Sequence, residues 1–261
     1  MKFNAIYEDI AQVITNAKKT VVLTGAGMST ESGLQDFRSN NGLWAGKDPM
    51  EIASTHTIRP QSFNESDTQY QQRIHAFVDF YVTRIKEVNT HEPNAGHRIL
   101  ADWGRKGYIS SIVTQNVDGY HEACGDPEVF PLHGTLLRLR CQQCDTAYGI
   151  ERYMLTSDER TYFCDQCVTG LIRPNIVLFG EGLDENYVKA EQAAKQADVM
   201  LVLGTSLQVM PASYLPMEVV DRGGKLIMIN FDDTPLDRYA DHIIHGEKIG
   251  EVLHKIDSLL S

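Results

Sequence analysis

The chain has 261 residues, of which 42% are hydrophobic and 23% are charged, and its 24 Lys and Arg against 35 Asp and Glu give a net charge of −11. This composition is typical of a globular protein and excludes collagen-like, coiled-coil and disordered chains. A chain this acidic also lacks the cationic surface that binds nucleic acid, so we expect no nucleic-acid partner.

The sequence contains no segment suited to a membrane or to export. Its longest apolar runs, around 199–203 and 226–229, have the length of strands and fall short of the roughly 18 residues that a bilayer requires. The N-terminal residues include acidic side chains where a signal peptide would be basic and then apolar. We therefore expect no membrane association and a cytoplasmic location.

Short apolar runs alternate with helical patterns along the chain. Apolar residues at helical spacing from Tyr7 to Ala17 predict a first helix, and the pattern over 185–197 predicts another. The predicted strands are 20–24, 109–114, 199–203 and 226–229. Near-continuous apolar strands that alternate with helices indicate a parallel sheet buried on both faces. The predicted fold class is therefore α/β, with a doubly wound, Rossmann-like sheet.

Two segments interrupt this alternation and predict a smaller domain. The first, 41–92, has no clear strand and is expected to form a helical insertion that carries a cofactor-binding loop. The second, 139–169, contains two cysteine pairs and is expected to form a zinc-ribbon insertion. We expect the Rossmann-like domain to consist of 1–40, 93–138 and 170–261.

The cysteine pairs Cys141–Cys144 and Cys164–Cys167 predict a structural zinc site. Two residues separate the cysteines of each pair and 19 residues separate the pairs, a spacing typical of zinc ribbons. Four thiolates around one tetrahedral Zn²⁺ leave no open position for catalysis. The alternatives are four unrelated cysteines or a redox pair, and two pairs at this spacing favour zinc. The fifth cysteine, Cys124, is expected to be a buried or turn residue.

Small and polar residues follow each predicted strand. They are Gly25-Ala26-Gly27, the run from Gln115 to Gly119, Gly204-Thr205-Ser206 and Asn230. Ligands of parallel α/β sheets bind beyond the carboxyl ends of the strands, so we expect the site at this edge. The glycine loop suits a nucleotide phosphate. A tight strand-to-helix turn explains the loop equally well when it is taken alone, because the full dehydrogenase and Walker motifs are missing.

Six motifs, in this order, resemble the signature of the sirtuin family. They are Gly25 to Ser39, Thr114 to Gly119, Leu132-His133-Gly134, Phe179-Gly180-Glu181, Gly204 to Leu207 and Ile229-Asn230. The cysteine pairs follow the His-Gly pair, as in that family, and the resemblance covers roughly residues 5 to 257. It implies an NAD-dependent protein lysine deacylase of the short bacterial type, with NAD as co-substrate, one structural zinc and acylated proteins as partners.

In the reaction that the resemblance implies, the amide oxygen of the acyl-lysine attacks the anomeric carbon of the nicotinamide ribose, nicotinamide leaves, and the acyl group ends on ADP-ribose. His133 matches the catalytic base, and an imidazole with an ordinary pKa of about 6.5 suits this task. Asn116 is implied to position the ribose and a water, and Asp118 to accept hydrogen bonds from the carboxamide. The alternatives are a mono-ADP-ribosyltransferase and a non-catalytic sensor of NAD or ADP-ribose.

The resemblance assigns the remaining cofactor contacts to the loops at the strand ends. The implied cofactor-binding residues are Gly25, Ala26, Thr30, Phe37, Arg38, Gln115, Asn116, Val117, Asp118, His133, Gly204, Thr205, Ser206, Asn230, Lys248 and Ile249. Phe37 is implied to cover the ribose and shield the reaction from water. Leu34-Gln35 replaces the family's usual Ile-Pro, and Thr135 stands where Ser is common.

The substrate residues that the resemblance implies fall in two segments. Val177-Leu178-Phe179-Gly180 matches the strand segment that pairs with the peptide, a contact that reads backbone more than side chains. Tyr81 and Arg84 resemble the pair that holds an acidic acyl group in the desuccinylase branch, but Asp36 replaces the Thr usual in that branch. An ordinary amphipathic helix is the alternative. The preference for acetyl or succinyl groups therefore stays open.

Overall fold

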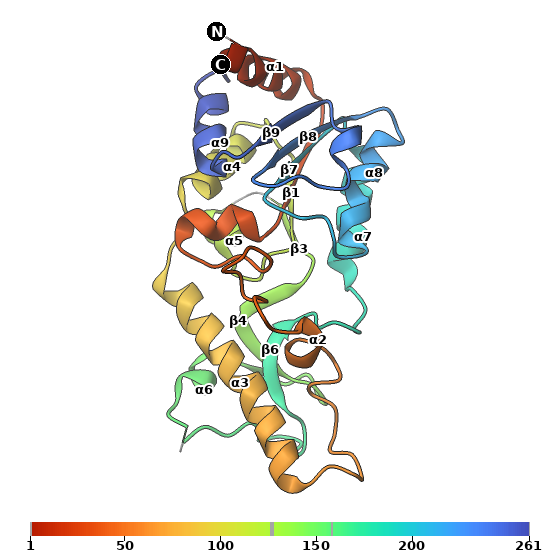
Figure 1. The fold of residues 1–261 in the computed structure, drawn as a ribbon. Helices are drawn as coiled ribbons and strands as arrows, with labels where there is room; N and C mark the ends of the chain where they lie inside the picture. The colour runs from red at the N-terminus through yellow and green to blue at the C-terminus, as the bar shows by residue number, and fades with distance from the viewer. Residues whose placement is uncertain (1, 126–127, 158, 261) are drawn as a thin grey trace.

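The computed structural model describes residues 2–125, 128–157 and 159–260. Its larger part is a central sheet between two layers of helices, and a smaller part lies beyond one edge of that arrangement (Figure 1). Among the described residues, no helix combines the length and the apolar character needed to cross a bilayer.

Six parallel strands form the central sheet. In spatial order they are β3 (Val129–Pro131), β2 (Ser111–Thr114), β1 (Thr20–Thr24), β7 (Val199–Leu203), β8 (Lys225–Asn230) and β9 (His242–His245). The chain begins at the centre, adds strands on one side and then returns to add strands on the other, which is the doubly wound order. Thr24 pairs with both Thr114 and Leu203, so the carboxyl ends are level. The predicted Rossmann-like sheet is confirmed.

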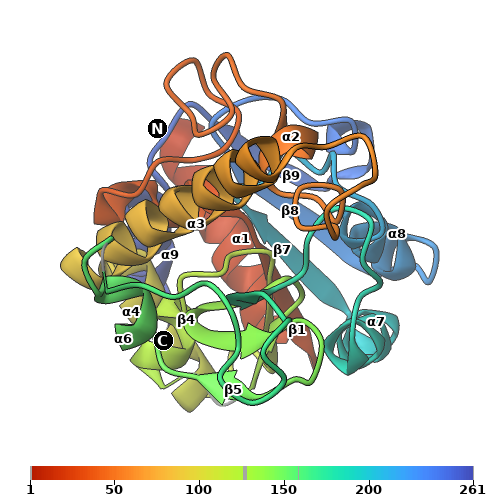
Figure 2. The ribbon, with the colours of Figure 1, turned by 90° about the horizontal axis from the view of Figure 1, so that it is seen from below.

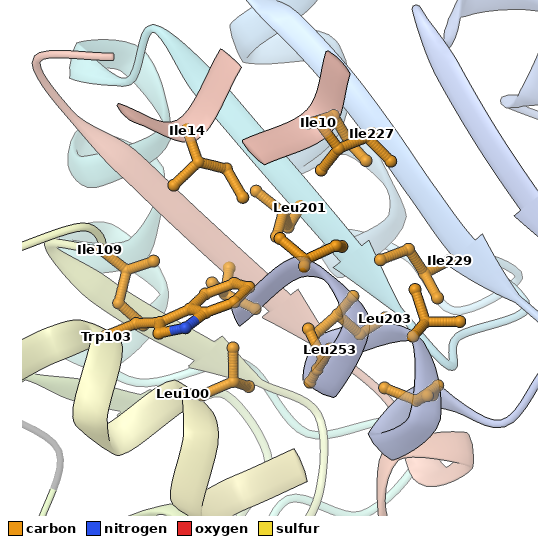
Figure 3. Close-up of a cluster of buried hydrophobic side chains, with 14 of the residues drawn as sticks. Ile10, Ile14, Leu100, Trp103, Ile109, Leu201, Leu203, Ile227, Ile229 and Leu253 are labelled. Atoms are coloured by element: carbon orange, nitrogen blue, oxygen red, sulfur yellow. The ribbon is translucent and has the colours of Figure 1, made fainter. Parts of the chain in front are cut away.

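Successive side chains of the central strands face opposite helical layers. The helices are α1 (Lys2–Asn16), α4 (Ala95–Arg105) and α9 (Ile249–Asp257) on one face, and α7 (Glu185–Gln196) and α8 (Leu215–Val220) on the other. On the first face, Leu201 of β7 packs in one cluster with Trp103 of α4 and Leu253 of α9 (Figure 3). Met200, the preceding residue, packs with the α7 and α8 layer. Burial on both faces explains the continuous apolar runs.

A three-stranded antiparallel sheet and a long helix form the smaller part. The elements are β5 (Ala147–Tyr148), β4 (Gly134–Cys141), β6 (Ile172–Ile176), α2 (Pro49–Ile52), α3 (Asp67–Thr90) and α6 (Glu151–Met154). Seen from below, α3 runs across the molecule as its longest helix among the described residues (Figure 2). Ser66 and Gln69 start α3 with a reciprocal capping box. Phe77 of α3 shares one apolar core with Leu139 and Ile172 of the small sheet.

Several elements were not among those predicted from the sequence, although α4 and α9 have clear amphipathic patterns. They include α4, α9, the edge strands β3 and β9, α5 (Tyr120–Cys124) and the 3-10 helices η1 (Ala26–Ser32), η2 (Ala212–Tyr214) and η3 (Asp237–Tyr239). β3 and β9 have three and four residues, which is too short to establish a periodicity. Segment 41–92 contains α2 and α3 between loops, as predicted. The division into domains at the residues given above stays a prediction.

Candidate functional site

The loops that follow β1 and β7 approach each other closely through glycines. The Gly25 N–H donates to the Leu203 carbonyl at 3.0 Å, and the Gly27 N–H donates to the Gly204 carbonyl at 2.9 Å. A Cβ atom on Gly25 would lie 2.6 Å from that of Thr205, and Gly204 has a φ of +61°. Side chains do not fit at such positions. The two loops therefore form one continuous floor at the carboxyl edge of the sheet.

A cavity of about 840 Å³ lies at this edge, a volume typical of small-molecule sites. The predicted site residues that line it are Gly25, Ala26, Phe37, Arg38, Tyr81, Arg84, Gln115, Asn116, Val117, His133, Val177, Leu178, Phe179, Gly180, Gly204, Thr205, Ser206 and Asn230. The fold thus brings residues from all six motifs, far apart in the sequence, to one place.

Four predicted cofactor-binding residues lie outside this cavity. Asp118 lines a smaller adjoining cavity together with Asn116. Thr30 is exposed, and its hydroxyl donates to the Gly27 carbonyl at 2.8 Å. Lys248 precedes the first turn of α9, whereas Ile249 is buried in the core cluster of that layer. Cofactor contacts of these residues stay predictions.

His133 lies in the cavity wall with a fixed tautomer. Its Nδ1 is 3.0 Å from the carbonyl oxygen of Gln115, and a carbonyl oxygen only accepts, so Nδ1 carries the proton. Nε2 therefore keeps its lone pair. Burial lowers the pKa of His133 below its ordinary value, and the hydrogen bond to Gln115 opposes that shift only partly. The side chain is a neutral imidazole at neutral pH, which is the state a general base needs.

Asn116 and Asp118 are held by Ser29, a residue that the sequence did not single out. The Ser29 hydroxyl donates to Asp118 Oδ2 at 2.7 Å and accepts from Asn116 Nδ2 at 3.1 Å. Asp118 Oδ1 also accepts the N–H of Tyr120 at 3.0 Å. Asn116 and Asp118 are both buried, so these bonds form out of water, where they are strong. Only the fold reveals this network, because Ser29 is 89 residues from Asp118.

A stack of three aromatic rings connects the loop after η1 with α3. The ring centroids of Phe37 and Trp44 lie 5.4 Å apart, and those of Trp44 and Phe80 lie 5.8 Å apart. All three side chains line the cavity. The stack gives the cavity an apolar wall beside the polar loops, and such walls exclude water from a reaction.

Tyr81 and Arg84 reach the same cavity from α3. Both are buried, and Arg84 Nη1 donates to Glu87 Oε2 at 2.6 Å, one turn further along the helix. Burial raises the pKa of Tyr81 above its ordinary value, so the hydroxyl stays a donor at neutral pH. The cavity therefore has a cation and a hydroxyl donor in one wall.

The segment Val177–Gly180 lines the cavity but does not form the strand that was predicted there. β6 ends at Ile176. The next N–H groups leave the small sheet, because Val177 donates to the His133 carbonyl and Phe179 to the Ala53 carbonyl, both at 2.9 Å. The chain thus continues as an extended loop with an isolated bridge between Phe179 and Ser54.

Several cavity-lining residues lie outside the motifs quoted above. They are Ala53, Trp44, Phe80, Leu136, Ile176, Gly182, Leu183, Tyr187, Gln208, Val209, Met210, Pro211, Phe231, Asp232 and Asp233. Residues 208–211 and 231–233 directly follow predicted motifs, so their closeness in sequence to those motifs could have predicted that they line the cavity. Trp44 and Phe80 had no such signal, because only the fold places α3 beside the cofactor loop.

The four paired cysteines converge beside β4 and β6. Their Sγ atoms all lie within 4.8 Å of one another. The Cys141–Cys167 and Cys144–Cys164 pairs have Sγ atoms 3.6 Å apart, and a tetrahedral Zn²⁺ with bonds of about 2.3 Å sets sulfurs about 3.8 Å apart. In each knuckle the N–H two residues after the first cysteine donates to its sulfur. The residues fit one zinc ion.

The sequence matches a known family and named relatives. The model of the Sir2 family matches residues 25–211. An NAD-dependent protein deacetylase of Oceanobacillus iheyensis is 46% identical, over 92% of this chain and 94% of its own length. An NAD-dependent protein deacylase of Archaeoglobus fulgidus is 37% identical, over 95% of this chain and 96% of its own.

Solved structures agree with these matches. A Sir2 homologue in complex with NAD superimposes with a TM-score of 0.83 at 35% identity, covering 97% of this chain and 93% of its own. A Sir2 with a deacetylated p53 peptide and 3′-O-acetyl ADP-ribose gives a TM-score of 0.83 at 32% identity, over 96% and 97%. The family model covers more than half of the chain and these relatives span nearly all of it, which confirms the resemblance read from the motifs: the chain belongs to the Sir2 family.

Proposed function

We propose that this protein is an NAD-dependent protein lysine deacylase, which transfers the acyl group of a modified lysine to ADP-ribose and releases nicotinamide. The observation that carries the proposal is the neutral imidazole of His133, in one cavity with Asn116 and the glycine loops. NAD is the co-substrate, and proteins with acylated lysines are the partners.

Different walls of the cavity bind different parts of NAD. The floor formed by Gly25 and Gly204 lets a diphosphate approach the backbone closely. Asn230, at the end of β8, lies on the side proposed for adenosine. Asn116, held by Ser29, orients the nicotinamide ribose, and the adjoining Asp118 accepts from the carboxamide.

His133 then acts as the general base. Its Nε2 accepts a proton from a ribose hydroxyl, and the bond from Nδ1 to Gln115 fixes the direction of the lone pair. The stack of Phe37, Trp44 and Phe80 keeps water from the reacting ribose, which would otherwise be hydrolysed.

The four cysteines hold the structural zinc ion. Four thiolates occupy every coordination position of a tetrahedral zinc ion. The ion therefore cross-links the two knuckles and leaves no position for a substrate. None of the four is among the residues that line the cavity. Their role is therefore to join the two knuckles of the small sheet.

The function is tested with NAD and a panel of acetylated, propionylated and succinylated peptides, with the products identified by mass spectrometry. We expect free lysine, nicotinamide and acyl-ADP-ribose in equal amounts. A protein that gains the mass of ADP-ribose would instead identify a mono-ADP-ribosyltransferase. Absence of nicotinamide release would identify a sensor that binds NAD without turnover.

The pH dependence of the reaction follows from the environment of His133. Burial lowers its pKa, so the base form persists below the ordinary value of about 6.5. We expect the acid limb of kcat/KM to have its midpoint below about pH 6.5, so that the rate changes little between neutral pH and about pH 8. The profile should be measured at constant ionic strength. An acid limb with its midpoint above about pH 6.5 would contradict this assignment.

For the acyl group, we propose that Tyr81 and Arg84 accept an acidic chain. Arg84 uses Nη1 for Glu87, and the other N–H donors of a guanidinium suit a carboxylate. In Arg84→Met we expect the ratio of desuccinylation to deacetylation to fall by at least about tenfold. Lys86→Met, on an exposed position of the same helix, is the control. An unchanged ratio in Arg84→Met excludes the acidic pocket.

A further inference from the structure

A buried arginine lies directly beneath the loop that follows β6. Arg173, in β6, is only 1% exposed. Its Nη1 donates to the Ile176 carbonyl at 2.9 Å, and its Nη2 donates to the carboxylate of Glu181. Among the described residues, its Nε–H has no hydrogen-bond partner. Glu181 is therefore the anion that compensates this buried charge.

Glu181 closes the loop at its other end. Its Oε2 accepts the Leu178 N–H at 2.9 Å, and its own N–H donates to the Leu178 carbonyl at 3.0 Å. Gly180 completes this turn with a φ of +93°, which a glycine adopts without strain. Both backbone groups of Leu178 are thus fixed by one residue, and that residue is anchored to Arg173.

The same loop is tied to the catalytic residue. The Val177 N–H donates to the carbonyl of His133 at 2.9 Å. On its other side, Phe179 exchanges hydrogen bonds with the 53–55 segment, accepting from the Thr55 N–H at 2.9 Å. A displacement of the loop would therefore change its distance from His133 and from the acyl-lysine that reacts beside it.

The pair also differs from the contacts that form the cofactor floor. Arg173 and Glu181 bond to each other and to Ile176 and Leu178. The N–H groups of Gly25 and Gly27 instead donate to the last residue of β7 and to the residue that follows it. The planar guanidinium reaches Ile176 and Glu181 simultaneously, because its donors point in fixed directions. The pair therefore holds the backbone on the peptide side of the cavity and makes none of these contacts on the NAD side.

We propose that Arg173 and Glu181 are a positioning pair that fixes the loop Val177–Gly180 at the distance from His133 at which an acyl-lysine peptide binds. The inference rests on the proposed deacylase function. It assigns the pair an effect on the KM for the peptide, with the KM for NAD unchanged.

The first test is Glu181→Gln in the full chain. The amide oxygen can still accept from Leu178, but the NH₂ group cannot accept from Arg173. We expect the KM for an acetylated peptide to rise between about tenfold and a hundredfold, the range for losing one hydrogen bond to a charged group. The KM for NAD should stay within about twofold of the wild-type value.

Two further variants separate positioning from folding. Glu181→Gln leaves a buried cation unpaired, which destabilises a fold, so Arg173→Met with Glu181→Gln removes both charges. The double variant should melt near the wild-type temperature and keep the raised peptide KM. Arg173→Lys retains the positive charge but loses the planar guanidinium that reaches two acceptors at once. Its KM for the peptide should therefore lie between that of the wild type and that of the double variant.

Asp79→Asn is the matched control. Asp79 pairs with Arg160, an arginine of the smaller part whose side chain is 7% exposed, at 3.1 Å, and neither residue lines the cavity. Its substitution should leave both KM values unchanged. A parallel rise of both KM values in Glu181→Gln, or a wild-type peptide KM in the double variant, would overturn the proposal.

A different result would contradict the proposed deacylase function itself. It would appear as an inactive wild-type protein on the whole peptide panel. Binding of a fluorescent acetylated peptide in the presence of ADP-ribose, followed by anisotropy, measures the peptide affinity without turnover. Equal peptide affinity of the wild type and Glu181→Gln in that measurement would exclude the positioning role whatever the activity.

Discussion

His133→Ala is expected to lower kcat/KM for deacylation by a factor of about 10² to 10⁴, the contribution of a positioned general base. The substitution removes the only imidazole that lines the cavity in the described part of the chain. It also removes the bond from Nδ1 to Gln115, which contributes about 1 kcal/mol to stability. The loss of rate should therefore far exceed the loss of stability.

The measurement is a steady-state assay beside a thermal melt. His254→Ala changes an exposed histidine of α9 and should retain full activity. If His133→Ala kept more than about a third of the wild-type kcat/KM, the base would have to be another group, since such a loss is below that expected for a general base.

Removal of the zinc ligands is expected to have the largest effect on stability. Cys164→Ser takes one thiolate from a site whose members Cys141 and Cys164 also belong to the apolar core under α3. Structural Zn²⁺ binding contributes about 10–16 kcal/mol at neutral pH, which is comparable to or larger than the whole stability of a typical protein. We therefore expect loss of the metal and unfolding of the small sheet.

This result is checked by zinc content and circular dichroism, and by prolonged chelation of the unchanged protein. Cys124→Ser is the matched control, because Cys124 is not part of the cluster. It should keep one zinc per chain and the wild-type melting temperature. A Cys164→Ser variant with normal metal content and melting would show that the cluster is not a metal site.

The sequence was sufficient for features that depend on local spacing. The zinc site was predictable because each knuckle is built from neighbouring cysteines. The strands β1 and β7 were predictable because burial on both faces of the sheet leaves them almost entirely apolar. The edge strand β9 was missed because its four residues are bounded by histidines.

Features that depend on long-range packing could not be read from spacing. Ser29 was not singled out in the sequence, and its contact with Asp118 exists because η1 places it there. Arg173 belongs to none of the motifs, and only the fold places it beside Glu181. The loop Val177–Gly180 was matched to a strand segment that pairs with a peptide, and this prediction came from the family resemblance. The structure shows that the hydrogen bonds of Val177 to His133 and of Phe179 to Ala53 lead it out of the sheet.

The two tryptophans of the chain lie in separate environments. Trp103 is fully buried between α4 and α9, where its indole N–H donates to Asp257 at 2.9 Å. Trp44 is stacked in the cavity wall and only half-buried. The tryptophan fluorescence of the protein therefore has two sources, because Trp103 reports on the packing of α4 against α9 and Trp44 reports on the environment of the cavity. In Trp103→Phe, Trp44 would be the single remaining tryptophan, and its emission would report changes at the cavity wall.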